Sequence, residues 1–310
     1  MELLYPSVWD IEVVMSLVED FVTHLKLEQI ADNEFVGYSR YSAAKNHVYG
    51  GQVLGQALFA ASCGLYDRQC HSLSAQFLRA GSLDGAIHFK LKNLRDGRNF
   101  SVRRVSAVQA GRELLTLDAS FHIDAHGFDQ QPTMPEVLGP ESCRSMTSYK
   151  DNFQLLGLDR LYGFFVTQSI FEFRCIELPS YLELSNRPAV QRMWIRAEQD
   201  IPNDQALQRA MLAYISDHNF IRTASLPYRQ QISKQPSQMA TLNHSMWIHR
   251  PLNLSDWHLY DVHSANCFGD RALVIGHIFA QTGELVATIV QEGLLRLLDG
   301  DEHAAFSENT

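Results

Sequence analysis

One aspartate occupies a position from which its side chain could act as a base. Four residues of the helix predicted over 204–220 recur at spacings of four, three and four, and so share one face: Ala206, Ala210, Ala213 and Asp217. The alanines allow another element to approach closely. Burial and the negative end of the helix dipole would both raise the pKa of the Asp217 carboxyl, which suits general-base catalysis near neutral pH. The alternative is that Asp217 simply bonds its neighbours at the helix end.

Two further polar residues lie in segments that are predicted to be strands. Gln291 follows the apolar run Leu285–Val290 and shares a strand face with Ala287 and Ile289. A buried amide requires partners, because an unpaired one costs about 1–3 kcal/mol. Thr241 opens another strand and presents its hydroxyl on the face opposite Leu242. Taken alone, each is most simply interpreted as an ordinary polar residue with its hydrogen bonds satisfied.

Two other features could bind anions. Gly50 and Gly51 precede a predicted helix, so the backbone N–H groups there could hold an anion or an oxyanion, although a plain turn would look the same. A basic cluster surrounds a predicted hairpin and is either a solvated face or a phosphate site: Arg95, Arg98, Arg103 and Arg104. No zinc-ligand, Walker or nucleophile-elbow motif occurs, and no metal or cofactor is expected.

These residues are embedded in an internal repeat. The segment SLSAQFLRAG (Ser72–Gly81) resembles TLNHSMWIHRP (Thr241–Pro251), and VQAGRELLTLDASF (Val108–Phe121) resembles AQTGELVATIVQEG (Ala280–Gly293). Both pairs are separated by about 170 residues and occur in the same order. Such an offset predicts a duplicated structural unit, with the function located where two similar halves meet.

Each half is predicted to combine one buried helix with an antiparallel sheet. In the first half, an amphipathic helix over 11–25 and a strand over 34–40 precede the apolar helix 52–65. Strands between 72 and 122 follow, broken at the turns Asp84-Gly85, Asp96-Gly97 and Ala110-Gly111. In the second half, a strand over 191–197 and the helix 204–220 precede strands over 240–250, 258–266, 272–280 and 285–297. This order is typical of an α+β protein.

The predicted boundaries follow from this order. Residues 1–130 form the first unit, 131–165 a surface linker, 166–298 the second unit with Asp217, Thr241 and Gln291, and 299–310 a polar tail.

Composition excludes several classes of protein. The formal net charge of −9 argues against a protein that binds nucleic acid over its whole surface. No apolar run approaches the roughly 20 residues that a membrane-spanning helix needs, and the acidic start has no basic region typical of a secretory signal. The five cysteines lack metal-ligand spacing and indicate reduced thiols. We therefore expect a cytoplasmic protein without a membrane span.

Seven segments together resemble the type II acyl-CoA thioesterase family: VYGGQVLGQAL (Val48–Leu58), FLRAG (Phe77–Gly81), LRDGRNFSVRRV (Leu94–Val105), TMPE (Thr133–Glu136), SDHNF (Ser216–Phe220), HSMWIHRP (His244–Pro251) and VQEGLLR (Val290–Arg296). The similarity extends over roughly residues 10 to 297. It implies a tandem, or double, hotdog fold, in which each half wraps an antiparallel sheet around a long buried helix. It also implies a homodimer or homotetramer.

The resemblance further implies hydrolysis of acyl-CoA to free acid and coenzyme A, with water activated by Asp217, Thr241 and Gln291. Gly51 or the Gln291 amide would meet the developing oxyanion, and the hairpin arginines would meet the phosphates of the substrate. Asn243 departs from the aspartate that relatives carry and would alter the charge near Thr241. The chain does not end in the serine-lysine-leucine type signal of peroxisomal members.

Two other functions stay open at this point. A hotdog hydratase or dehydratase would pair a carboxylate with a histidine, but Asp217 and His218 are adjacent on a helix and point about 100° apart. A non-catalytic acyl-CoA-binding protein could share the fold, although a binder has no need of three water-activating groups.

Overall fold

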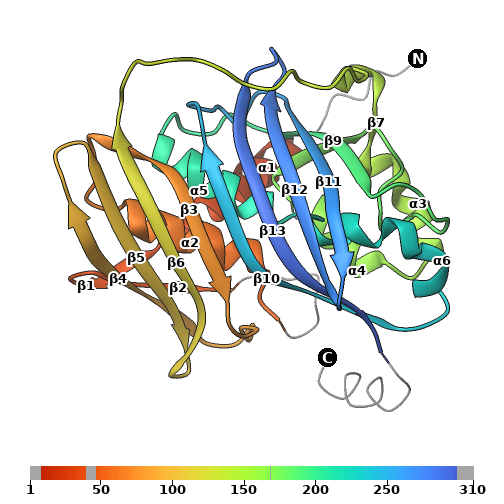
Figure 1. Cartoon of the computed structure of the whole chain (residues 1–310), viewed down its shortest axis with the longest axis horizontal. Coiled ribbons are helices and arrows are strands. Elements are labelled where there is room, and N and C mark those ends of the chain that lie inside the picture. The colour runs from red at the N-terminus through yellow and green to blue at the C-terminus, as the bar shows by residue number, and fades with distance from the viewer. Residues whose placement is uncertain (1–7, 40–46, 168, 299–310) are drawn as a thin grey trace.

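A computed structural model describes residues 8–39, 47–167 and 169–298 (Figure 1). The strands form one antiparallel sheet in the order β1-β2-β4-β5-β6-β3-β10-β13-β12-β11-β9-β8-β7. Two central helices, α2 and α5, lie together on one face of this sheet (Figure 1). The predicted tail 299–310 and the predicted strand position Arg40 lie outside the described residues.

The first half follows the predicted order. Its elements are α1 (Val8–Leu25), β1 (Glu28–Ala31), β2 (Glu34–Tyr38), α2 (Gly50–Ser62), β3 (Arg68–Phe77), β4 (Ala86–Asp96), β5 (Phe100–Gln109) and β6 (Arg112–Ile123). The three predicted turns separate β3 to β6, and Gly85, Ala110 and Gly111 have positive φ angles. β1 was not predicted, because all four of its residues are exposed and so carry no burial pattern.

The second half repeats this arrangement. Its main elements are β9 (Val190–Ala197), α5 (Gln205–Ser216), β10 (Ser237–Ile248), β11 (His258–Phe268), β12 (Arg271–Ala280) and β13 (Leu285–Leu297). Asp204 caps α5 by accepting hydrogen bonds from the backbone of Ala206 and Leu207. The helix ends at Ser216 and not at the predicted Phe220. Asn219 has a φ of 58°, which interrupts the helix, and η4 (Ile221–Tyr228) and α6 (Arg229–Ile232) follow.

The segment predicted to be a surface linker is largely part of the folded second half. After 124–139, which has no helix or strand, the chain forms η1 (Pro140–Ser142), β7 (Arg144–Ser145), η2 (Met146–Tyr149), α3 (Lys150–Leu155), α4 (Asp159–Tyr162), η3 (Gly163–Thr167) and β8 (Phe171–Cys175). Met146, Tyr149 and Phe153 are buried in the main core, and β7 pairs with β8. The surface prediction is wrong here because these apolar residues recur at helical spacing and pack inward.

The two halves are related by a pseudo-twofold arrangement centred on β3 and β10. These strands pair with each other, with Ser74 opposite Ser245 and 3.1 Å between their hydroxyl oxygens. A bulge falls at Cys70/Ser72 in one half and at Thr241/Asn243 in the other, so the positions correspond at an offset of 171 residues. This is the double hotdog fold, and the predicted fold class is confirmed.

The central helices run antiparallel at very close range. A Cβ atom added to Gly51 would lie 2.3 Å from the carbonyl oxygen of Tyr214, and one added to Gly55 would lie 2.7 Å from that of Ala210. Glycine on α2 and the predicted alanine face of α5 therefore allow backbone-to-backbone packing. Because the helices are antiparallel, the C-terminal end of α5 meets the N-terminal end of α2.

Candidate active site

Asp217 lies at this junction of the two helices. It is the C-terminal capping residue of α5, and its Oδ2 would be 2.9 Å from a Cβ atom on Gly50. The backbone N–H of Gly51 interacts with the Asp217 carboxylate and lowers its pKa. The first half thus contributes the positive end of α2 to a carboxylate of the second half. Gly51 is at the site as predicted, but its N–H is engaged with Asp217; oxyanion binding by Gly51 stays a prediction.

Thr241 and Gln291 converge on the same carboxylate from neighbouring strands. The Thr241 hydroxyl donates to Asp217 Oδ1 at 3.3 Å, and Gln291 Nε2 donates to the same oxygen at 3.1 Å. Gln291 also donates to the Thr241 hydroxyl oxygen. β10 and β13 carry the two side chains, and Gln291 is completely buried. The three predicted residues therefore form one hydrogen-bonded cluster.

Burial raises the pKa of Asp217 to about 6, while hydrogen bonds from Gln291, Thr241 and Gly51 act in the opposite direction. The residue retains some solvent exposure, although its carboxylate is enclosed by protein. A carboxyl group that titrates near pH 6 is ionised at neutral pH and is still basic enough to accept a proton from water.

His218 does not form the carboxylate–histidine pair of the hydratase alternative. Its ring stacks on Phe173 with 4.5 Å between ring centroids, and burial lowers its pKa to about 3. The ring is therefore neutral at physiological pH, and its stacking partner lies on β8.

The structure adds two residues that sequence reasoning did not assign to the site. His244 is buried on β10 directly opposite Gln291, and its Nε2 lies 3.0 Å from the hydroxyl oxygen of Ser216. Both residues open segments that resemble the family, but their types and spacing predict no role, because their proximity depends on strand register and on the position of the bulge in β10.

The predicted arginine cluster is not brought to Asp217. It surrounds the hairpin between β4 and β5. In this hairpin the carbonyl oxygen of Gly97 accepts a hydrogen bond from Arg68, which lies at the start of β3. The other end of β3, at Phe77, adjoins Gly50, and a strand of this length spans roughly 30 Å. Phosphate binding by these arginines stays a prediction, and a substrate bound there would have to extend from the hairpin to Asp217.

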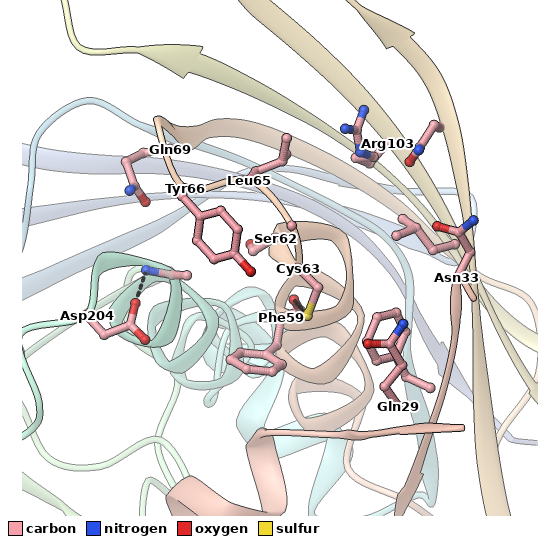
Figure 2. Close-up of a pocket in the computed structure, with 15 residues that line it drawn as sticks. Gln29, Asn33, Phe59, Ser62, Cys63, Leu65, Tyr66, Gln69, Arg103 and Asp204 are labelled. Atoms are coloured by element: carbon pink, nitrogen blue, oxygen red, sulfur yellow. Dashed lines mark hydrogen bonds between the residues drawn. The ribbon is translucent and has the colours of Figure 1, made fainter. Parts of the chain in front are cut away.

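The four arginines also differ in their surroundings. Arg103 is buried and forms an ion pair with Asp96 at 2.8 Å, and Arg104 forms a two-pronged pair with Asp118. Arg95 and Arg98 are exposed. Figure 2 shows Arg103 beside a cavity of about 620 Å³, which is also lined by Phe59, Ser62 and Cys63 of α2 and its C-terminal cap. Asp204 at the start of α5 lines it as well, so this cavity is at the opposite end of the helix pair from Asp217.

At this opposite end, apolar residues or cysteines occupy the positions equivalent to the cluster. Cys63 caps α2 as Asp217 caps α5, and Cys70 at the β3 bulge corresponds to Thr241. In the first half, Ala119 of β6 pairs with Leu73 of β3. In the second half, Gln291 of β13 pairs with His244 of β10, so Ala119 occupies the position that corresponds to Gln291. The three-residue cluster is therefore formed at one end of the helix pair and is replaced at the other.

Comparison with known proteins gives a consistent assignment. The acyl-CoA thioesterase family model matches residues 179–294, and that of the acyl-CoA thioesterase N-terminal domain matches residues 39–122. Acyl-CoA thioesterase 2 of Haemophilus influenzae is 37% identical over 281 residues, which are 90% of this chain and 98% of that protein. This chain belongs to the acyl-CoA thioesterase family.

Other members of the family agree over the same length. Human acyl-coenzyme A thioesterase 8 is 34% identical over 284 residues, covering 89% of this chain and 88% of that protein. The crystal structure of acyl-CoA thioesterase II TesB2 from Mycobacterium marinum has a TM-score of 0.73 at 31% identity, covering 90% of this chain and 98% of that chain. Among the described helices, none has both the length and the apolar character that a membrane crossing requires.

Proposed function

We propose that this chain hydrolyses acyl-CoA thioesters to the free acid and coenzyme A, with Asp217, Thr241 and Gln291 activating the water. The observation that carries the proposal is the convergence of Thr241 and Gln291 on one oxygen of a carboxylate whose pKa is raised to about 6. The family names of the relatives support the substrate class.

The reaction needs one proton acceptor and a good leaving group. Asp217 takes a proton from water as the water oxygen attacks the thioester carbonyl carbon. Thr241 and Gln291 hold the water by sharing with it the O–H and N–H groups that point to Asp217 in the resting site. The tetrahedral intermediate then breaks the carbon–sulfur bond, and coenzyme A leaves as a thiolate that is protonated by Asp217 or by solvent. A thiolate leaves readily, so no strong acid is needed. General-base assistance is typically worth about 10²–10⁴-fold in rate.

The test is free-thiol release from acyl-CoAs of short to long chain, with wild type and Asp217→Asn measured side by side. We expect hydrolysis by wild type and a loss of about 10²–10⁴-fold in the variant, with an unchanged circular dichroism spectrum. Near-full activity of Asp217→Asn would overturn the role of the base. If wild type binds acyl-CoA but releases no thiol, the binding-protein alternative is correct instead.

The remaining expectations belong to the same proposal. We propose a homodimer or homotetramer that acts in the cytoplasm on acyl-CoA and needs no cofactor. Light scattering coupled to gel filtration at micromolar concentration measures the oligomeric state, and a monomeric mass would contradict it.

A further inference from the structure

His244 is positioned to control the side chain of Gln291. The two residues face each other as Cα partners across β10 and β13, and both are completely buried. One ring nitrogen of His244, Nε2, lies 3.0 Å from the hydroxyl oxygen of Ser216, the residue before Asp217. The histidine therefore bridges from the end of α5 to the amide of the catalytic cluster.

The amide of Gln291 has a defined orientation in this cluster. Its Nε2 donates to both Asp217 and Thr241, which leaves Oε1 directed away from them. Among the described residues, neither Gln291 Oε1 nor His244 Nδ1 makes a hydrogen bond of regular geometry, although both atoms are buried. The ring and the amide nevertheless interact, and this interaction raises the pKa of His244 against the larger effect of burial, which lowers it to about 4.

A neutral imidazole carries its proton on one nitrogen only. With the proton on Nδ1, the ring donates to Gln291 Oε1, and Nε2 accepts from the Ser216 hydroxyl. With the proton on Nε2, the lone pair of Nδ1 would face Oε1, which places two acceptors together in a buried site. The Ser216 hydroxyl is also 2.8 Å from the carbonyl oxygen of Ala213, so it can turn toward either acceptor.

We propose that His244, as the Nδ1–H tautomer, is a positioning residue that fixes the amide of Gln291 with its NH₂ group toward Asp217 and Thr241. A reversed amide would place Oε1 near Asp217 Oδ1, where Nε2 now lies at 3.1 Å. Two acceptors in that position would repel one another and would disfavour the ionised base. This inference rests on the proposed thioesterase function.

Two substitutions separate the nitrogens of the ring. His244→Asn keeps a donor close to the place of Nδ1, whereas His244→Gln offers one close to the place of Nε2 and leaves Gln291 without it. We expect His244→Asn to retain kcat within about threefold. We expect His244→Gln to lose about 10–100-fold in kcat with little change in KM, a loss of the size seen when a hydrogen-bond partner that orients a metal-ligating side chain is removed.

The pH dependence provides a readout that a merely structural role would not change. In His244→Gln the acid limb of kcat/KM should move to higher pH, because a reversed amide disfavours the Asp217 carboxylate. In His244→Asn the limb should stay in place. Equal losses in both variants, or full activity in His244→Gln, would overturn the proposal.

A direct measurement on wild type covers the case in which a variant does not fold. Long-range ¹⁵N–¹H correlation spectra of histidine-labelled protein distinguish the two neutral tautomers, and the signal of His244 is the one absent from whichever His244 variant folds. The Nδ1–H tautomer supports the proposal, and the Nε2–H tautomer refutes it. If wild type fails to hydrolyse any acyl-CoA, the proposed function fails, while the tautomer still decides how His244 meets Gln291.

Discussion

At the scale of single residues, Asp217 is held between opposing effects. Removal from water raises its pKa, and three donors, Gly51, Thr241 and Gln291, offset part of that rise. The Asp217 carboxyl is consequently more basic than an ordinary aspartate and is still mostly ionised at physiological pH. The two side-chain donors can be removed in turn to test how the balance is set.

Removal of the Thr241 donor should shift the pH profile. In wild type, kcat/KM should rise with pH through about 6 as Asp217 loses its proton. In Thr241→Val, which keeps the shape of the side chain, the ionised carboxylate loses a hydrogen bond, so the midpoint should move to higher pH. Activity measured from pH 4.5 to 8.5 at constant ionic strength tests this, and a midpoint that moves down would contradict it.

The same group should make the protein less stable when it ionises. The folded pKa of about 6 lies above the unfolded value near 3.9, so the folded state binds the proton more tightly. The free energy of unfolding should therefore fall between about pH 4 and pH 6, and Asp217→Asn should lack this loss. Urea unfolding at pH 4.5 and 8 should show the variant gaining on wild type by at most about 3 kcal/mol. A difference that does not change with pH would contradict this.

Asn243 replaces the aspartate expected from the family resemblance, and its role is local. Its Oδ1 accepts a hydrogen bond from the backbone N–H of Glu292 at 3.2 Å, beside Gln291. Asn243→Asp keeps an acceptor for this bond but adds a negative charge close in sequence to Thr241, whose hydroxyl bonds Asp217. We expect unchanged folding and an acid limb of kcat/KM moved to slightly higher pH, measured alongside wild type.

At the scale of elements, the site depends on how closely α2 approaches α5. Gly51→Ala would place a methyl group 2.3 Å from a backbone carbonyl, so the helices must move apart. Overpacking of this kind costs about 1–3 kcal/mol, and it should also pull the Gly51 N–H away from Asp217 and lower kcat. Gly139→Ala is the matched control, since no atom of the described residues lies within 4 Å of its added carbon. Equal stability and activity of the two variants would show that the helices tolerate separation.

The segment between the halves contributes to the core of the second half. Phe153 of α3 is 1% exposed, while Leu155 of the same helix is 83% exposed. We expect Phe153→Ala to cost about 3–5 kcal/mol and Leu155→Ala to change little, as measured by thermal or urea unfolding. Equal, small effects would instead favour the surface linker predicted from composition.

The elements show where prediction from sequence succeeds and where it stops. Asp217 was found because a helix face is encoded in local spacing, and the strands were found because their alternation is local as well. Thr241 and Gln291 gained their roles only by family resemblance, since their meeting depends on the register of β10 against β13 and on a bulge. His244 and the engagement of Gly51 with Asp217 depend on contacts between distant segments, which no local pattern contains.

At the scale of the whole molecule, the sheet and the helix pair join the halves into one unit. β3 pairs with β10 at the centre of the sheet, and the proposed catalytic cluster takes Gly51 from one half and its other members from the second. Residues 166–298 alone, although they carry Asp217, Thr241 and Gln291, would therefore lack a donor to the base and a pairing strand for β10. Both halves are required for one site.

With the proposed catalytic cluster, the unequal ends of the helix pair predict one catalytic site per chain. Two hotdog units are present, but Cys63, Cys70 and Ala119 stand where Asp217, Thr241 and Gln291 stand in the other. On the proposed function, the first unit would contribute scaffold and the Gly51 N–H but no base of its own. A homodimer of this chain would hold four hotdog units and two catalytic sites. Titration with a tight-binding thioether analogue of the substrate should abolish turnover at one equivalent per polypeptide.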